Sequence, residues 1–106
     1  MPKYLWQVNY TNEGAAGLLR EGGSSRRDAI VAMVESVGGH VESCYYALGS
    51  TDLYVIGDLP DEAAAAALSL HTASAGGAHS VTVALLTPEQ LDEAARRTPT
   101  YRPPGA

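Results

Sequence analysis

The stretch that decides the fold is Tyr46-Ala-Leu-Gly-Ser-Thr-Asp-Leu-Tyr-Val-Ile-Gly-Asp58. Aromatic and β-branched residues on both sides of a Gly49-Ser-Thr segment predict two strands, over residues 40–48 and 52–58. A connection this short makes the two strands antiparallel neighbours. The middle of the fold is therefore a β-hairpin.

Upstream of this hairpin, the sequence predicts one strand and two helices. Residues 4–10 are rich in aromatic and β-branched side chains and are typical of a strand. Thr11-Asn12 can cap a short helix over residues 13–20. A second helix is predicted to begin at Ser25, the N-cap of a capping box, and to end at Gly38-Gly39.

Downstream of the hairpin, Pro60-Asp-Glu is a typical helix start, and that helix ends no later than Gly76-Gly77. Alternating side chains over residues 79–86 predict a fourth strand. Thr87-Pro-Glu-Gln90 is a second capping box and predicts a final helix to about Arg97.

The predicted order of elements is β-α-β-β-α-β with an additional terminal helix, which indicates a ferredoxin-like α+β fold. In this fold a four-stranded antiparallel sheet has its helices on one face, and the other face is open. Residues 1–97 form one domain, and the proline-rich residues 98–106 form a C-terminal tail.

Composition excludes several classes of partner. The chain has 106 residues, a net charge of −5 and no basic run longer than two residues, so nucleic acid and anionic membranes are not expected partners. The sequence shows neither a secretion signal nor a long apolar segment, and Cys44 is the single cysteine. We expect a cytoplasmic protein, and the many alanines and glycines with one lysine suggest a bacterial source.

Side chains alternate between the two faces of a strand, so the sequence predicts which residues meet the helices. The residues expected on the helix side are Leu53, Val55, Val81, Val83 and Leu85. Those expected on the open side are His40, Glu42, Cys44, Tyr46, Tyr54 and Ile56, which Trp6 and Tyr10 can join.

An open face this aromatic indicates an interface or a ligand site. Pairing with a second copy of the chain would bury rings that are each worth about 1.5–3 kcal/mol of burial, so we expect a homodimer or a higher oligomer. The same face could hold a small hydrophobic or aromatic molecule, with Trp6, Tyr10, His40, Tyr46 and Tyr54 as ligand contacts. The alternative is that these side chains only pack the interface between copies.

His40 and Glu42 share one strand face and are the candidate acid–base pair for catalysis. No metal site is expected, because His40 and Cys44 lie about 13 Å apart along an extended strand. Cys44 fits a small core residue better than a nucleophile. No phosphate-binding loop or other cofactor motif is present, so no cofactor is expected.

Four motifs resemble the GYD domain family in order and spacing over residues 4–87. They are Val8-Asn-Tyr-Thr11, Gly38-Gly-His-Val41, Leu48-Gly-Ser-Thr-Asp-Leu53 and Pro60-Asp-Glu-Ala-Ala64. The resemblance implies a dimeric α/β barrel of ferredoxin-like units, and members of the family have largely no assigned activity. Thr51 stands where the family carries tyrosine.

Three functions fit these features. The first is a binding module that holds a small hydrophobic or aromatic molecule without turning it over. The second is a cofactor-independent enzyme, of the oxygenase, isomerase or cyclase type, that acts on such a molecule. The third is a purely structural assembly module.

Overall fold

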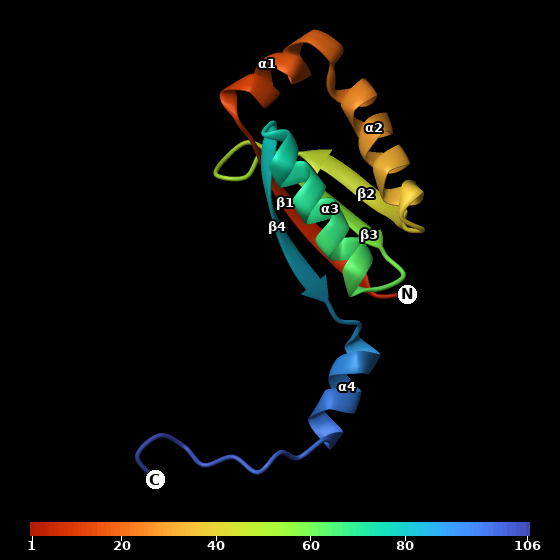
Figure 1. The fold of residues 1–106 in the computed structure, drawn as a ribbon. Helices are drawn as coiled ribbons and strands as arrows, with labels where there is room; N and C mark the ends of the chain where they lie inside the picture. Colours follow the sequence, from red (N-terminus) through yellow and green to blue (C-terminus); the bar gives the residue numbers. More distant parts are fainter.

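The computed structural model describes residues 1–106 and contains one antiparallel sheet of four strands (Figure 1). The order of strands across the sheet is β2-β3-β1-β4. The strands are β1 (Lys3–Tyr10), β2 (His40–Tyr46), β3 (Leu53–Asp58) and β4 (Ala78–Leu85). The hairpin of β2 and β3 is confirmed as an antiparallel pair.

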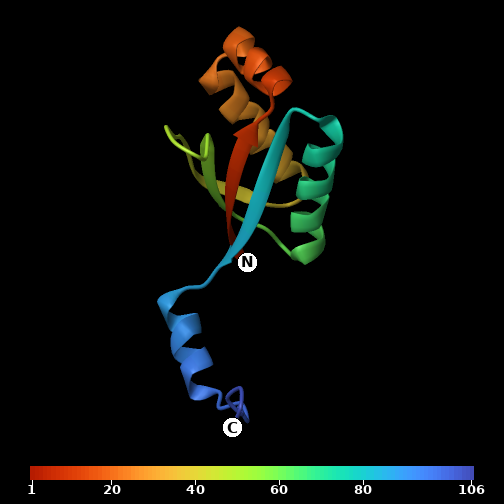
Figure 2. The same cartoon turned by 90° about the vertical axis from the view of Figure 1, so that its left-hand side faces the viewer.

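Four helices accompany the sheet: α1 (Asn12–Glu21), α2 (Gly23–Ser36), α3 (Glu62–Ala75) and α4 (Pro88–Arg96). Helices α2 and α3 lie on one side of the sheet, and the other side is uncovered (Figures 1 and 2). The predicted ferredoxin-like α+β fold is thus confirmed. None of the four helices has the length and apolar character that crossing a membrane requires.

Side-chain caps start three of the helices. The side chains of Thr11, Asp61 and Thr87 accept hydrogen bonds from backbone N–H groups of the first turns of α1, α3 and α4. The predicted capping box of Thr87 and Gln90 is confirmed.

The predicted start of the second helix is wrong. Its N-cap is Gly22 rather than Ser25, and α2 begins at Gly23. Gly22 alone separates α1 from α2 and has a φ of 84°, a conformation that favours glycine. The turn between the two helices is therefore tighter than a serine-capped start would allow.

The core lies between the sheet and α2 and α3. Leu53 and Val55 of β3 are buried there, as predicted, together with Leu59 after the strand and Val34 of α2. The rings of Tyr4 and Trp6 stack with their centroids 6.1 Å apart and fill the space over β1. Burial of this set stabilises the domain chiefly through the hydrophobic effect.

A β-bulge in β2 overturns half of the prediction for this strand. Val41 pairs with Gly57, but the next matched pair is Ser43 with Ile56, so Glu42 is an additional residue. An additional residue reverses the faces of every side chain after it. Cys44 and Tyr46 therefore lie on the helix side, not on the open side.

The predicted faces of β1 and β4 are also corrected. Trp6 and Tyr10 belong to the helix side, where Trp6 is buried and Tyr10 packs against the core. Val81, Val83 and Leu85 are cross-strand partners of Gln7, Leu5 and Lys3 on the open side. The helix side of β4 carries small residues, and this lets the alanine-rich α3 pack closely; Ser69 of α3 and Thr82 of β4 are hydrogen-bonded at 3.0 Å.

The uncovered side of the sheet, called the open face below, is apolar in its middle. Its members by register are Leu5, Gln7, Tyr45, Tyr54, Ile56, Val81, Val83 and Leu85. Tyr45 is 71% exposed and Val81 is 60% exposed. At one end of this face, Lys3 forms ion pairs with Glu42 at 3.2 Å and Asp58 at 3.1 Å.

Helix α4 and the tail extend away from the rest of the molecule (Figures 1 and 2). Every residue from Leu86 to Ala106 is exposed. Ion pairs of Glu93 with Arg96 and Arg97 lie along α4, at 2.9 and 3.5 Å. This arm contributes nothing to the core.

Candidate functional site: a cavity between the sheet and the helices

A mainly apolar hollow lies between the sheet, α2 and α3, and is called the inner cavity below. Its volume is about 70 Å³. Ten of its thirteen lining residues are hydrophobic, and they come from β1, β3, β4, α2 and α3. They include Trp6, Val8, Ile30, Leu53 and Val55.

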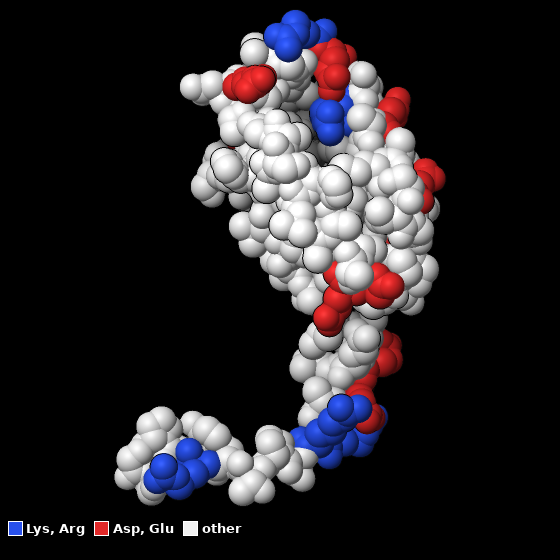
Figure 3. Space-filling model, in the orientation of Figure 1, with Lys and Arg blue, Asp and Glu red and all other residues white.

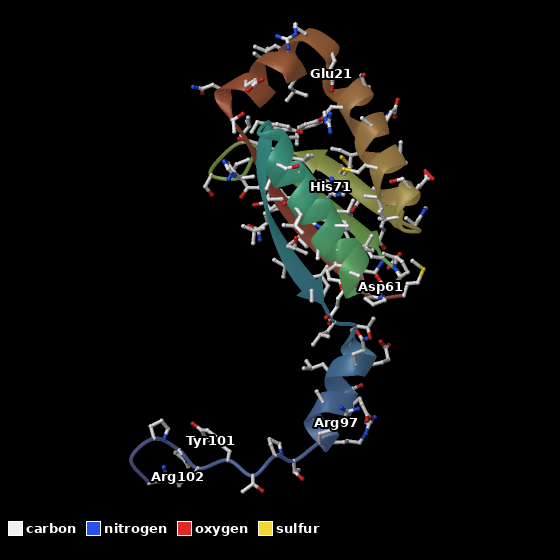
Figure 4. All side chains as sticks on the ribbon, viewed as in Figure 1. Glu21, Asp61, His71, Arg97, Tyr101 and Arg102 are labelled. Atoms are coloured by element: carbon white, nitrogen blue, oxygen red, sulfur yellow. The ribbon has the colours of Figure 1, made fainter.

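A second hollow, the outer cavity, lies between α1, the start of α2 and the end of α3. It measures about 330 Å³ and shares five lining residues with the inner cavity: Tyr10, Arg26, Met33, Thr72 and Ala78. Figure 3 shows the surface hollowed at this end, with acidic and basic side chains close by. Glu21 at the end of α1 and His71 of α3 belong to the outer lining (Figure 4).

The indole N–H of Trp6 is an unpaired donor beside the inner cavity. Trp6 is only 6% exposed, and its Nε1 has no hydrogen-bond partner. The Cζ3 edge of the ring lies 3.2 Å from the place where a β-carbon on Gly57 would stand. This edge of the ring therefore packs against β3. A buried donor without an acceptor costs about 1–3 kcal/mol, so such an atom is rare in a folded protein.

Two tyrosines stand close together at the β1–β2 end of the site. The Tyr46 hydroxyl donates a hydrogen bond to the carbonyl of Gly23 at 3.1 Å. The pKa of Tyr10 is raised to about 12, chiefly by burial and to a smaller extent by the neighbouring Tyr46. Burial also raises the pKa of Tyr46. Tyr10 therefore stays protonated at neutral pH and can donate a hydrogen bond.

Arg26, in the first turn of α2, brings a positive charge to both cavities. Its charge opposes the rise in the pKa of Tyr10 and of Tyr46, so it lies near both phenols. The nearest carboxylate oxygen belongs to Glu21 and is 3.9 Å from the guanidinium, too far for a hydrogen bond. Arg26 thus has donors to offer to a ligand.

Polar contacts at the ends of the strands hold the site in place. The Asp52 carboxylate accepts a hydrogen bond from the backbone N–H of Tyr10 at 2.9 Å, and Asn9 accepts one from the backbone N–H of Asp52 at 3.1 Å. On the other side, the backbone N–H of Thr11 donates to the carbonyl of Gly77 at 3.1 Å. These bonds fix Tyr10 and the start of α1 relative to β3 and β4.

Comparison with known proteins identifies the domain. Residues 4–95 of the chain match the family model described as the GYD domain. The chain belongs to the GYD domain family. No protein of curated function matches this GYD domain.

In this GYD domain, the residues that the sequence analysis selected as site candidates lie on two different faces of the sheet. Trp6 and Tyr10 line the inner cavity, and Tyr46 lies beside Tyr10. His40, Glu42 and Tyr54 lie on the opposite, open side and line neither cavity. The expected group of five ligand contacts is therefore not one cluster.

The catalytic candidates His40 and Glu42 line neither of the two cavities. His40 and Glu42 are exposed, and Glu42 is bound to Lys3 in an ion pair. Cys44 is partly buried on the helix side, and burial raises the pKa of its thiol, which disfavours the reactive thiolate. No three His, Cys, Asp or Glu side chains gather in a group that could hold a metal ion.

Arg26 is the charged cavity-lining residue that the sequence analysis missed. Ile30 and Met33 follow it at spacings of four and seven, so Arg26 lies on the apolar face of α2. A charged residue within an apolar helical stripe is the signal that could have revealed it.

Proposed function

We propose that this GYD domain binds a small, mainly apolar molecule in the inner cavity and assembles as a homodimer through its open face. The observation that carries the first part is the apolar inner cavity, which opens onto the outer cavity at Tyr10 and Arg26. The cavity walls would bury the apolar part of a ligand, and the side chains of Tyr10 and Arg26, which line both cavities, would bind its polar part.

The size of the two cavities sets the size of the ligand. A dry cavity that holds benzene measures about 150 Å³, so the inner cavity alone is too small for a free ring. Together with the outer cavity, the space suits a molecule of one ring with a short substituent. Such a ligand would extend past Tyr10 and Arg26, which line both hollows.

Binding without catalysis is the function that the lining of the inner cavity favours. General acid–base catalysis needs a titratable group within hydrogen-bond reach of the substrate. His40 and Glu42 are exposed on the other side of the sheet and cannot reach a ligand in the inner cavity. Tyr10 holds its proton too tightly at neutral pH to act as a base.

The single tryptophan makes ligand binding measurable at one atom. Trp6 gives one indole N–H signal in a ¹H–¹⁵N NMR spectrum. Titration with indole, phenol or benzyl alcohol should shift this signal in a saturable way. Thr72→Leu, which narrows the passage between the two cavities, should weaken binding, and Ser74→Leu on the exposed side of α3 should not. A Trp6 signal that no such compound moves would refute the binding function.

The homodimer is supported by the apolar middle of the open face. A second copy can place the same surface against it around a twofold axis, which lets each apolar side chain be buried by its counterpart. Side chains such as Val81 and Tyr45, now exposed, would gain about 1.5–3 kcal/mol each if fully buried.

Light scattering at micromolar concentration tests the assembly. The wild-type particle should have twice the mass of the 11.1-kDa chain. Val81→Glu should return it to the mass of one chain, since a charge cannot be buried unpaired. Leu70→Glu is the matched control, because Leu70 is 70% exposed on α3, away from the open face. A wild-type particle of one chain would contradict the dimer.

A further inference from the structure

The inner cavity is rich in hydrogen-bond donors and poor in acceptors. Trp6 and Arg26 can only donate, and Tyr10 keeps its proton at neutral pH. The remaining polar side chains of its lining are the hydroxyls of Thr72 and Ser80, which can do either. No carboxylate lines this cavity. A ligand that matches such a lining must supply acceptor atoms.

Arg26 makes weaker polar contacts than Arg27 and Arg96 do. Arg27 lies 3.1 Å from the carboxylate of Asp28, and Arg96 lies 2.9 Å from that of Glu93. Arg26 makes no side-chain hydrogen bond, and its closest carboxylate oxygen, on Glu21, is 3.9 Å away. A planar guanidinium with free donors matches a carboxylate bidentately and gains a charge-assisted hydrogen bond.

The placement of Arg26 and Tyr10 fixes which end of the ligand meets them. Both residues line the inner and the outer cavity, so they stand at the junction of the two. The apolar walls lie further inside, beside Trp6. A bound molecule would therefore place its apolar part inward and its acceptor group at the junction.

We propose that the ligand is a small monocarboxylate with an aromatic or branched apolar body. This inference rests on the proposed binding function. Its carboxylate is bound by the Arg26 guanidinium and the Tyr10 hydroxyl, and its body extends from the junction of the two cavities into the inner cavity toward Trp6. Glu21 lines the outer cavity only, so its carboxylate, 3.9 Å from the Arg26 guanidinium, stands outside the inner cavity.

Three probes of equal ring size separate the charge from the shape of the ligand: benzoate, benzyl alcohol and benzylamine. Each is titrated into the full chain while the Trp6 indole N–H signal is followed. Benzoate should bind about tenfold more tightly than benzyl alcohol, the gain expected from one charge-assisted hydrogen bond. Benzylamine should bind no more tightly than benzyl alcohol.

Substitution of Arg26 assigns this preference to one side chain. Arg26→Gln should bring the affinity for benzoate down to that for benzyl alcohol. Arg27→Gln is the matched control, because Arg27 is adjacent, exposed and in neither cavity. Should Arg26→Gln fail to fold, the wild-type chain still gives the test, since added salt should weaken binding of benzoate and leave benzyl alcohol unchanged.

The outcomes distinguish this inference from the function on which it rests. Equal affinities for the three probes would overturn the carboxylate and leave the binding function standing. Tightest binding of benzylamine would also overturn it and would point to Glu21. If none of the three probes moves the Trp6 signal, both proposals fail.

Discussion

The Tyr46 hydroxyl is hydrogen-bonded to the carbonyl of Gly23 at 3.1 Å and ties the end of β2 to the first residue of α2. The ring of Tyr46 lies 3.1 Å from the place where a β-carbon on Gly23 would stand, so a larger residue at position 23 would crowd this ring. This contact exists because the bulge in β2 turns Tyr46 toward the helices. It closes the β2 side of the site next to Tyr10.

Removing this hydroxyl should destabilise the domain. Tyr46→Phe loses the bond to Gly23 and should lower the free energy of unfolding by about 1 kcal/mol. The melting temperature should fall by about 4–8 °C, as expected for a domain of this size. Tyr45→Phe is the control, since Tyr45 is 71% exposed on the open face. Equal melting temperatures of the two variants would contradict the structural role of the bond.

Two glycines of α1 should respond to alanine in opposite ways. A β-carbon on Gly14 would stand 1.9 Å from the carbonyl oxygen of Gly77, a backbone atom that cannot move aside cheaply. Gly14→Ala should therefore lower the free energy of unfolding by about 1–3 kcal/mol. Gly17 meets nothing closer than the end of Arg20 at 3.7 Å, so Gly17→Ala should raise it by about 0.5–1 kcal/mol through helix propensity. Chemical denaturation measures both, and the same sign for the two variants would be inconsistent with the packing of α1.

Stability should fall at alkaline pH. Burial raises the pKa of Tyr10 from 10.0 to about 12, so the folded chain holds this proton more tightly than the unfolded chain. The contribution to stability is complete below pH 10 and is lost as the pH rises toward 12. Its size is about 1–2 kcal/mol after allowance for partial solvent exposure. The free energy of unfolding, measured between pH 9 and 12, should fall less steeply for Tyr10→Phe than for the wild type or for Tyr45→Phe. Equal slopes for all three would argue against the burial of Tyr10.

The C-terminal arm should be dispensable for folding of the domain. Every residue from 86 to 106 is exposed, and α4 has no buried residue. A chain that ends at Leu86 should keep its free energy of unfolding within about 0.5 kcal/mol, as for other surface changes. The comparison should be made at one protein concentration, because assembly adds to apparent stability. A larger loss would mean that the arm packs on the domain or on a second copy.

The sequence predicts the order of elements well because glycines and capping residues mark their ends locally. Thr87 and Gln90 form both bonds of the predicted capping box. Asp61 caps α3 and directly follows Pro60, the residue that indicated a helix start in the sequence. The hairpin at Gly49 and the resulting antiparallel pair follow from a connection too short for anything else. These features depend on neighbours in the chain and not on distant contacts.

The sequence predicts the faces of the strands less well, because they depend on contacts between distant elements. One additional residue at Glu42 moves Cys44 and Tyr46 to the helix side, and strict alternation cannot reveal it. On β4 the large residues suggested a core face, but α3 packs on the small ones, as the Ser69–Thr82 hydrogen bond shows. The cavity itself arises from the spacing of α2 and α3, which no local pattern encodes.

Where Gly14 and Gly77 meet, one wall of the outer cavity consists of main-chain atoms and has no side chain that can change its rotamer. Gly14, Gly17 and Gly77 line that cavity, and none of them has a side chain that could swing toward or away from a bound molecule. Other parts of the lining carry Glu21, Arg26 and His71, which are long and can adopt several conformations. The reach of a ligand toward α1 is therefore limited by main-chain atoms at a fixed position. Ligands of different length can be accommodated only by movement of the polar side chains on the rest of the wall.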